Sequence, residues 1–191
     1  MPKQKKLLNS PFFLRDGAVV LRPFTRRDLL SAEYLRWMND PRVTRTIGRF
    51  DYLFPVSRAK LIEYFGSIDT DSTIFLGIHA PTKVRRRRVL VGTLKIYDID
   101  QLARRAALGI MVGDTKVWGR GIASTAISMA CRYVFGELGF QKIVAGYLAT
   151  NEGMRRAFKK NDFEIEGVLR EQFFVAGQLV DHVLVSKFRD Q

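Results

Sequence analysis

Lys116-Val117-Trp118-Gly119-Arg120-Gly121-Ile122-Ala123-Ser124 separates an apolar run from an amphipathic segment. The apolar run, residues 106–112, predicts a buried strand. After Gly121, apolar residues recur every three or four positions, which predicts a helix with one buried face. These apolar residues are Ile122, Ala126, Ile127, Ala130, Val134 and Leu138. The sequence therefore predicts a strand, a glycine-rich turn and a helix that begins directly after Gly121.

This arrangement is suited to binding an anion. The first amides of a helix lack intrahelical acceptors and lie at the positive end of the helix dipole. Gly119 and Gly121 permit a close backbone approach and positive φ angles, and Arg120 adds a full positive charge. We predict a phosphate or pyrophosphate on the amides between Trp118 and Ser124. A helix entry that needs glycine only for its turn is the alternative, because a lone G-x-G is a weak signal.

Three motifs identify a family resemblance. Lys116-x-x-Gly119-x-Gly121 resembles the acetyl-CoA pyrophosphate loop Q/R-x-x-G-x-G/A of the GNAT acetyltransferases, with lysine in place of the usual first residue. Residues 151–163 resemble N-x-x-S-x-R-x-x-E-K-x-G-F of the ribosomal-protein N-acetyltransferase-like branch. Residues 35–41 resemble its W-x-N-D-P motif. The three occur in the family's order across roughly residues 17–188.

The resemblance and the periodicity together predict the fold class. We expect a single α+β domain over residues 15–191, preceded by a basic lead, residues 1–14. The GNAT arrangement implies a mixed, mostly antiparallel sheet of about seven strands with about four helices on both faces. The periodicity places strands at 17–23, 73–79, 89–97, 104–112, 142–148, 163–174 and 179–187. It places helices at 25–38, with a capping box formed by Thr25 and Asp28, at 57–66, after Gly121, and at 151–161, with Asn151 as the N-cap.

The resemblance also implies where acetyl-CoA and the acceptor bind. The pantetheine arm would lie along the backbone of Ile110, Met111 and Val112. The pyrophosphate would lie on residues Trp118, Gly119, Arg120, Gly121, Ile122, Ala123 and Ser124. Further contacts to the coenzyme are predicted for Asn151, Arg156, Phe158 and Lys159. Trp37, Asn39 and Asp40 are predicted to shape the acceptor cleft, although helix termination explains the last two equally well.

The chemistry implied by the resemblance is direct transfer of an acetyl group to an amine. This reaction requires a neutral amine and a proton for the departing thiolate. At the position of the family's usual tyrosine acid this chain has Phe158, and Ala107 replaces a frequent strand glutamate. We therefore predict Tyr147 and Asn151 as the catalytic residues, with Tyr147 as the thiolate acid. A core tyrosine is the alternative interpretation of Tyr147.

The histidines and the single cysteine carry weaker signals. His79 and His182 are predicted to be sheet residues rather than bases. Asp181 is next to His182, but neighbouring residues of a strand point to opposite faces, so we expect no dyad. Cys131 is predicted to be a small buried hydrophobic residue rather than an acyl acceptor.

The charge restricts the acceptor. Lys and Arg number 32 against 19 Asp and Glu, which gives a formal net charge of +13. Such a surface attracts anions and repels polyamines. Neutralising an amine of pKa ~8 at pH 7 costs about 1.4 kcal/mol, against about 4.6 kcal/mol for a lysine side chain. We therefore expect a low-pKa primary amine, on an anionic amino sugar, an amino acid or other small molecule, or a protein N-terminus.

Other function classes are less well supported. The arginine run 85–88 lacks interleaved aromatic residues, so a solvated hairpin tip is favoured over an RNA site. No apolar run approaches the ~20 residues of a membrane span, and no signal-peptide pattern is present, so we expect a cytoplasmic protein without a membrane or metal partner. A non-catalytic acyl-CoA-binding module and a ribosome- or RNA-associated basic module are the alternatives. The sequence leaves open whether the protein forms a homodimer.

Overall fold

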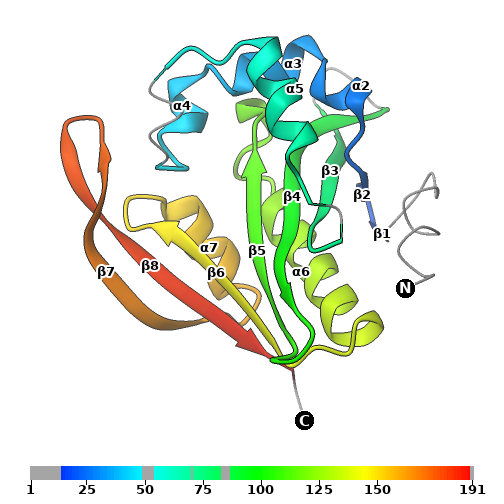
Figure 1. Cartoon of the computed structure of the whole chain (residues 1–191), viewed down its shortest axis with the longest axis vertical. Coiled ribbons are helices and arrows are strands. Elements are labelled where there is room, and N and C mark those ends of the chain that lie inside the picture. Colours follow the sequence, from blue (N-terminus) through cyan, green and yellow to red (C-terminus); the bar gives the residue numbers. More distant parts are fainter. Residues whose placement is uncertain (1–13, 49–53, 70, 83–86, 190–191) are drawn as a thin grey trace.

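The computed structural model describes residues 14–48, 54–69, 71–82 and 87–189. One eight-stranded sheet runs through the molecule, with the spatial strand order β1-β2-β3-β4-β5-β6-β8-β7 (Figure 1). Its strands are β1 (Leu14–Asp16), β2 (Val19–Pro23), β3 (Ile74–Pro81), β4 (Arg88–Asp100), β5 (Arg105–Val112), β6 (Lys142–Leu148), β7 (Glu164–Val175) and β8 (Gln178–Phe188). The predicted α+β class with a mixed, mostly antiparallel sheet is confirmed.

The pair β5 and β6 is the parallel pair of this sheet, and it separates along its length. The two strands are paired from Arg105 opposite Lys142 to Leu108 opposite Ala145. Beyond these residues the strands diverge, and no described strand pairs with this edge of β5 from Gly109 to Val112. Figure 1 shows β5 and β6 meeting at their amino-terminal ends and opening toward their carboxyl-terminal ends. The sheet therefore contains a V-shaped opening between two of its central strands.

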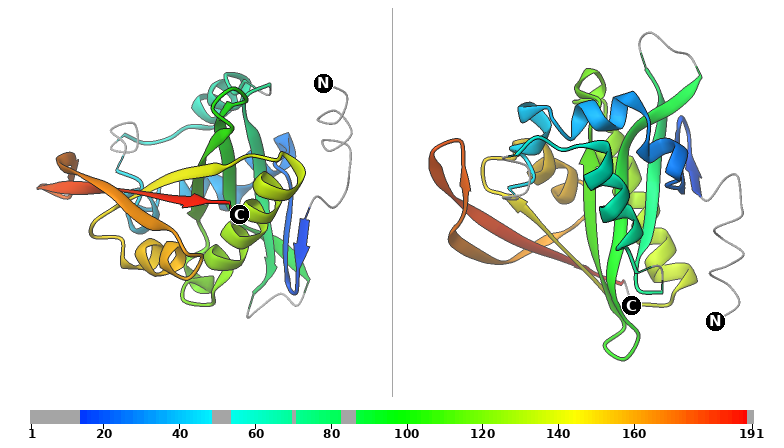
Figure 2. Two further views of the ribbon diagram at one scale, coloured as in Figure 1. Left: turned by 90° about the horizontal axis from the view of Figure 1, so that it is seen from below. Right: turned by 45° about the horizontal axis from the view of Figure 1, so that its top comes forward.

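Helices cover both faces of the sheet. On one face lie α2 (Arg26–Leu29), α3 (Ala32–Trp37), α4 (Pro41–Thr44) and α5 (Arg58–Gly66). The other face carries α6 (Ile122–Arg132), continued by the π-helical turn η3 (Tyr133–Glu137), and α7 (Glu152–Lys159). The two views of Figure 2 show these groups on opposite sides of the sheet. We refer to the α2–α5 face and the α6–α7 face.

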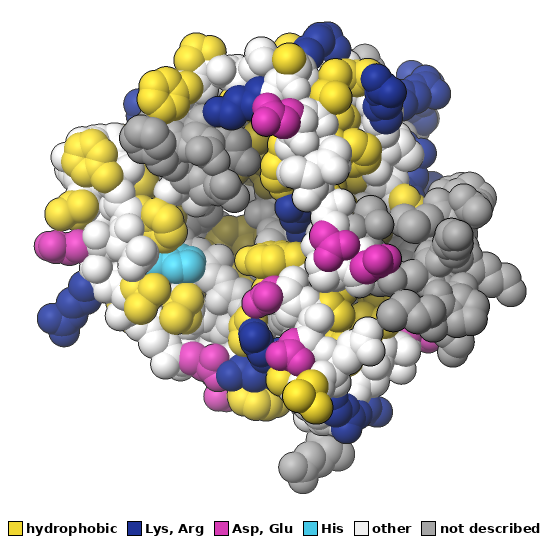
Figure 3. All heavy atoms as spheres, viewed as in Figure 1, with side chains coloured by type: hydrophobic (Ala, Val, Ile, Leu, Met, Phe, Trp, Pro, Cys, Tyr) yellow, Lys and Arg dark blue, Asp and Glu magenta, His cyan; other side chains and the backbone are white. Residues whose placement is uncertain are grey.

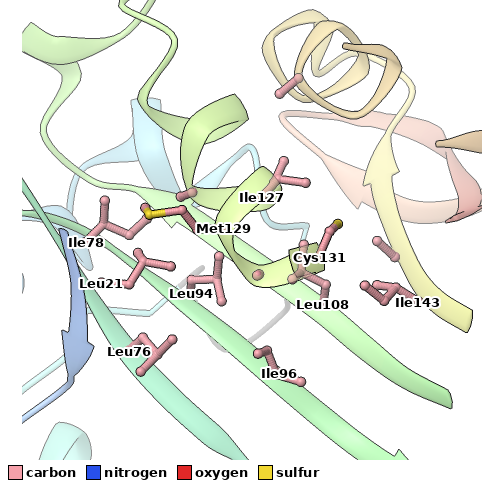
Figure 4. Close-up of a cluster of buried hydrophobic side chains, with 14 of the residues drawn as sticks. Leu21, Leu76, Ile78, Leu94, Ile96, Leu108, Ile127, Met129, Cys131 and Ile143 are labelled. Carbon is pink, nitrogen blue, oxygen red and sulfur yellow. The ribbon is translucent and has the colours of Figure 1, made fainter. Parts of the chain in front are cut away.

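The main core lies between the sheet and the α6–α7 face. Leu21, Leu76, Ile78, Leu94 and Ile96 of the sheet are almost fully buried against the apolar stripe of α6 (Figure 4). Cys131 belongs to this cluster and is buried, as predicted. Burial raises the pKa of its thiol to about 12, so the side chain is uncharged and unreactive at neutral pH.

A second core forms on the α2–α5 face. Phe24, Tyr34 and Trp37 are buried there, and the Phe24 and Tyr34 ring centroids lie 5.0 Å apart. Trp37 packs directly on the backbone of Gly113, where an added Cβ would come within 2.3 Å of the indole. This contact fixes α3 to the end of β5. None of the described helices is long and apolar enough to cross a membrane.

The structure adds three elements to the predicted secondary structure. The sheet has eight strands rather than seven, because residues 14–16 pair with β2 before the turn at Gly17. The helix predicted over residues 25–38 is two helices, because Ser31 interrupts it and its hydroxyl accepts from the amide of Tyr34 to cap α3. The helix α4 was not predicted either, so the described residues contain six α-helices where about four were expected. The capping box of Thr25 and Asp28 is confirmed.

Candidate active site

A cavity of about 720 Å³ occupies the opening between β5 and β6. The space-filling view of the α2–α5 face shows this hollow, with hydrophobic side chains in its floor (Figure 3). Its wall combines the carboxyl-terminal half of β5, the loop before α6, the first turn of α6, the end of β6 and the start of α7. Thr46, Ile47, Tyr97 and His182 complete it on the α2–α5 face. The cavity therefore passes through the sheet from one face to the other.

The loop before α6 has the geometry of an anion site. Gly119 has a φ of 73° and Gly121 a φ of 75°, and both have open space where a Cβ would stand. Gly121 is the N-cap of α6 and offers no side-chain cap. The amides of Ile122, Ala123 and Ser124 thus open into the cavity without a capping side chain. Backbone donors and the helix dipole favour an anion at this point.

The side chains flanking this loop take different directions. The Trp118 Nε1 donates to the Val112 carbonyl oxygen at 2.8 Å, which holds the loop to the end of β5. Arg120 instead donates to the Pro81 carbonyl oxygen at 3.2 Å and is not part of the cavity wall. Its predicted contact with the coenzyme stays a prediction.

Helix α7 closes the cavity opposite α6. The Asn151 Oδ1 accepts from the Met154 amide at 3.1 Å and caps α7, as predicted, while no acceptor for its Nδ2 is found among the described residues. At the other end of α7, the Asn161 Nδ2 donates to the Ser124 carbonyl oxygen at 3.1 Å. This bond fixes α7 to the first turn of α6. Arg156 lines the cavity, whereas Lys159 does not and its neighbour Lys160 does.

Tyr147 lies on the α6–α7 face of the cavity. Its ring stacks on Phe158 with centroids 6.0 Å apart, and both side chains are buried. Within the described part of the chain its hydroxyl has no hydrogen-bond partner. Burial raises the pKa of the phenol, so it is protonated at neutral pH. A protonated phenol beside Phe158 is placed to donate a hydrogen bond into the cavity.

His182 lies on the α2–α5 face of the same cavity. An added Cβ on Gly146 would come within 2.3 Å of its Nε2, so the imidazole covers the Gly146 backbone. Because Gly146 and Tyr147 are adjacent in β6, the two face opposite sides of the sheet. Burial lowers the pKa of His182, which keeps the imidazole neutral at pH 7.

Sequence reasoning missed the wall on the α2–α5 face. Thr46 and Ile47 follow α4 and line the cavity. The next residue, Gly48, has a φ of 70° and packs against the side chains of Leu148 and Phe173. Tyr97 covers Gly109, as shown by the 3.4 Å that would separate its Cε1 from an added Cβ. These residues come from separate segments with no shared motif. Glycines at positions 109 and 146 are the one local signal, because each leaves room for a ring above the strand.

The residues predicted to shape the acceptor cleft lie outside this cavity. Trp37 is buried in the second core. Asn39 bonds the backbone of Val56 with both its amide atoms, at 2.8 and 3.0 Å. The Asp40 carboxylate accepts from the amide and guanidinium of Arg42 and caps α4. All three have structural contacts, so their role in acceptor binding stays a prediction.

The other histidine is structural. His79 is buried in β3, where its Nε2 accepts from the Arg22 Nε at 2.8 Å. Burial and the adjacent Arg22 lower its pKa to about 4. The Asp181 carboxylate accepts from the Glu171 amide at 2.8 Å and forms no dyad with His182, as predicted. Among the described residues, no group of three or more His, Cys, Asp and Glu side chains is placed to hold a metal ion.

Comparison with known proteins agrees with this geometry. The profile of the acetyltransferase (GNAT) domain family matches residues 18–164. The uncharacterised N-acetyltransferase YoaA of Bacillus subtilis (strain 168) is 29% identical over 168 residues, which cover 88% of this chain and 92% of YoaA.

Solved structures share the fold. The Vibrio cholerae spermidine N-acetyltransferase in complex with CoA and spermine superposes with a TM-score of 0.77 at 22% identity, covering 91% of this chain and 96% of that one. Mycobacterium smegmatis RimJ in complex with CoA-disulfide superposes with a TM-score of 0.74 at 21% identity, covering 89% and 81%. Both structures hold CoA in a fold with the same overall arrangement.

Proposed function

Because the chain belongs to the acetyltransferase (GNAT) domain family, we propose that it moves an acetyl group from acetyl-CoA directly to a low-pKa primary amine. The observation that carries this proposal is the cavity through the sheet, which has an anion site at one end and the side chains of Tyr147 and His182 on its two faces. The enzyme class, an acyltransferase, follows from the family; the acceptor is our inference.

The α6–α7 face fits the donor. The diphosphate would lie on the free amides at the start of α6, with Arg156 and Lys160 adding positive charge in the same wall. The pantetheine arm is a chain of amides and methylenes, and the unpaired edge of β5 from Gly109 to Val112 offers it backbone partners. The Asn151 Nδ2 is a further donor toward this arm. These features support the predicted coenzyme contacts, apart from Arg120 and Lys159.

Tyr147 supplies the proton for the departing thiolate in this proposal. The family's usual tyrosine position is occupied by Phe158, which cannot donate a proton. The Tyr147 ring of β6 stacks on Phe158 of α7 and both residues line the cavity, which supports a phenol acting in the same region. A free thiol has a pKa near 8.5, below that of the phenol, so the Tyr147 hydroxyl stabilises the developing sulfur charge as a hydrogen-bond donor before the proton is transferred.

The acceptor is a low-pKa amine rather than a polyamine. The wall includes one carboxylate among the described residues, Glu152, and the Arg155 guanidinium binds both its oxygens at 2.7 to 3.0 Å. No free carboxylate is then available to bind the second ammonium of a polyamine. The net charge of +13 also repels such a substrate. On the α2–α5 face the wall is mainly apolar, which favours an amine attached to a neutral or anionic group.

Thiol release from acetyl-CoA tests this proposal. The native chain would be assayed at pH 7.5 with glucosamine, glycinamide, a tripeptide with a free N-terminus, Nα-acetyl-lysine and spermidine. We expect turnover with at least one of the first three and a kcat/KM at least about tenfold higher than for the last two, as the ~3 kcal/mol difference in amine neutralisation predicts. A preference for spermidine would refute the acceptor class.

Calorimetry with acetyl-CoA distinguishes an acetyltransferase from a non-catalytic acyl-CoA-binding module. A chain that binds acetyl-CoA with micromolar affinity and releases no thiol with any of the five amines would be an acyl-CoA-binding module. A chain that neither binds nor reacts would refute the donor site as well.

A further inference from the structure

We propose that His182 is a catalytic residue of this chain and accepts the proton that the acceptor amine loses on acetylation. The inference rests on the proposed function and assigns a role that the three predicted motifs do not contain. It is carried by the position of the imidazole, on the face of the cavity opposite the proposed donor site.

The opening in the sheet gives donor and acceptor separate entrances. Leu108 and Ile110 pack with the α6–α7 core, so Gly109 and Met111 face the other side. By the same alternation in β6, Tyr147 faces the α6–α7 side and Gly146 the α2–α5 side. A donor held at α6 therefore meets an acceptor that enters from the α2–α5 face. His182 lies above Gly146, at this second entrance.

The imidazole is held in place by packing, and its nitrogens form no hydrogen bond with the described residues. The planes of the imidazole and the Phe173 ring are inclined at 82°, with the ring centroids 5.2 Å apart. The imidazole also rests on the Gly146 backbone. Neither nitrogen has a hydrogen-bond partner among residues 14–48, 54–69, 71–82 and 87–189. A neutral histidine with a free nitrogen in an open cavity can accept a proton without first breaking another contact.

The surroundings keep this imidazole neutral. Packed against it are Gly146 and Leu148 of β6 and Phe173 of β7, none of which titrates. The Asp181 carboxylate is bound to the Glu171 amide. The other titratable or charged side chains of the cavity wall are Tyr97, Tyr147, Glu152, Arg156 and Lys160. Burial is the cause of the lowered pKa of His182, so its conjugate acid readily returns the proton.

The remaining candidates in the described wall are less suitable as bases. Burial raises the pKa of Tyr97, so the phenol stays protonated at neutral pH. The Arg155 guanidinium lowers the pKa of Glu152 and occupies both its oxygens. Glu152 is thus a weak base whose oxygens are already engaged. Among these three, His182 is the group whose basic atom is both unprotonated at neutral pH and unengaged.

Acetyl transfer in this site moves two protons. The amine nitrogen forms a bond to the thioester carbonyl carbon, and the carbon–sulfur bond breaks. The proton lost by nitrogen passes to a nitrogen of His182, directly or through one water. The sulfur leaves with the electron pair of the broken bond and takes a proton from the Tyr147 hydroxyl. The proton on His182 then leaves to solvent, and the Tyr147 phenol recovers one, so that an acetamide and a free thiol are produced.

Steady-state kinetics of His182→Gln test this role. The acceptor is glycinamide, or the best amine of the panel, and the matched control is His79→Gln at the other histidine. We expect kcat to fall about 100-fold or more in His182→Gln, with KM for acetyl-CoA within about threefold of native. Below the pKa values of the amine and His182, log kcat/KM should rise with pH with a slope of two in the native chain and in His79→Gln. The slope should be one in His182→Gln.

Two further readouts exclude a merely structural role. Added imidazole should restore activity to His182→Ala, because the truncated side chain leaves a space on Gly146. The chain holds two histidines, so an imidazole NMR titration of the native chain and His79→Gln assigns both. We expect His182 to titrate below the ordinary range of a histidine, because burial lowers its pKa.

The proposal is overturned if His182→Gln keeps kcat within threefold, if it loses activity but keeps the slope of two, or if His182 is protonated at pH 7. Absence of thiol release by the native chain with every amine would instead overturn the proposed function. The NMR titration needs no acceptor and decides the ionisation state of His182 in either case.

Discussion

The two entrances of the cavity are built in different ways. On the α6–α7 face, the anion site is a continuous stretch of chain from Trp118 to Ser124, and its donors are backbone amides. On the α2–α5 face, the wall comes from four separated segments, around Ile47, Tyr97, Leu148 and His182, and it is formed by side chains. The first entrance is fixed by local geometry and the second by tertiary packing.

This difference has a functional consequence. A site made of backbone amides at a helix start depends on glycines and on the helix itself, so many side chains around it can change without loss of binding. A site made of side chains from separate segments changes its shape with each substitution. We infer that the α6–α7 face is suited to one constant donor and the α2–α5 face to the particular acceptor of this chain.

Tyr147→Phe gives the largest effect we expect from the α6–α7 face. Loss of the hydroxyl removes the proton source for the thiolate, so kcat should fall by about 100-fold or more. KM for acetyl-CoA and the melting temperature should change little, since the hydroxyl has no hydrogen-bond partner among the described residues.

Phe158→Tyr in the same background sharpens this test. If a phenol is what this region requires, the double variant should recover part of kcat, because the two rings stack at 6.0 Å. The measurement is the initial rate of thiol release at saturating acetyl-CoA. An unchanged kcat in Tyr147→Phe would remove Tyr147 from the mechanism.

Ala123→Asp tests the backbone site without weakening the helix. Ala123 lies in the first turn of α6 and in the cavity wall. A carboxylate there opposes a bound diphosphate by about 3 kcal/mol at an effective dielectric of about 20, which corresponds to about 100-fold weaker binding of CoA. The same charge stabilises a helix start by about 0.3–1 kcal/mol, so the melting temperature should hold or rise.

Ala123→Asn is the matched control, with the same shape and no charge. Calorimetry with CoA should give this variant an affinity much closer to native than that of Ala123→Asp. Equal losses in the two variants would mean that shape, not charge, governs this entrance.

The same contrast decides what the sequence could predict. The strand, loop and helix around Gly121 were predicted because a buried strand, two glycines and a 3.6-residue period are local signals. The confirmed Asn151 cap is also local. In the region between Thr25 and Met38 the periodicity continued across Ser31, so the break between α2 and α3 was missed.

The α2–α5 wall could not be predicted in this way. His182 was interpreted as a sheet histidine, and it is one: its place in β8 is as predicted. What gives it a cavity position is the separation of β5 and β6 beyond Leu108, together with the missing side chain of Gly146 across the strand pair. Both are tertiary features. Trp37 shows the converse, since a motif residue predicted to bind the acceptor is packed on Gly113 in the second core.

Gly146→Ala gives the smallest effect and the most direct test of this dependence on packing. An alanine Cβ would come within 2.3 Å of the His182 Nε2 and 2.7 Å of its Cε1, so the imidazole must move. We expect kcat to fall about tenfold while CoA binding stays native, since a displaced base loses part of its contribution. Gly167→Ala, in the β7–β8 hairpin that carries His182, has open space at the Cβ position and is the control. If Gly146→Ala and Gly167→Ala are equally active, the position of the imidazole has no bearing on the reaction, and the α2–α5 entrance tolerates change as well as the α6–α7 entrance does.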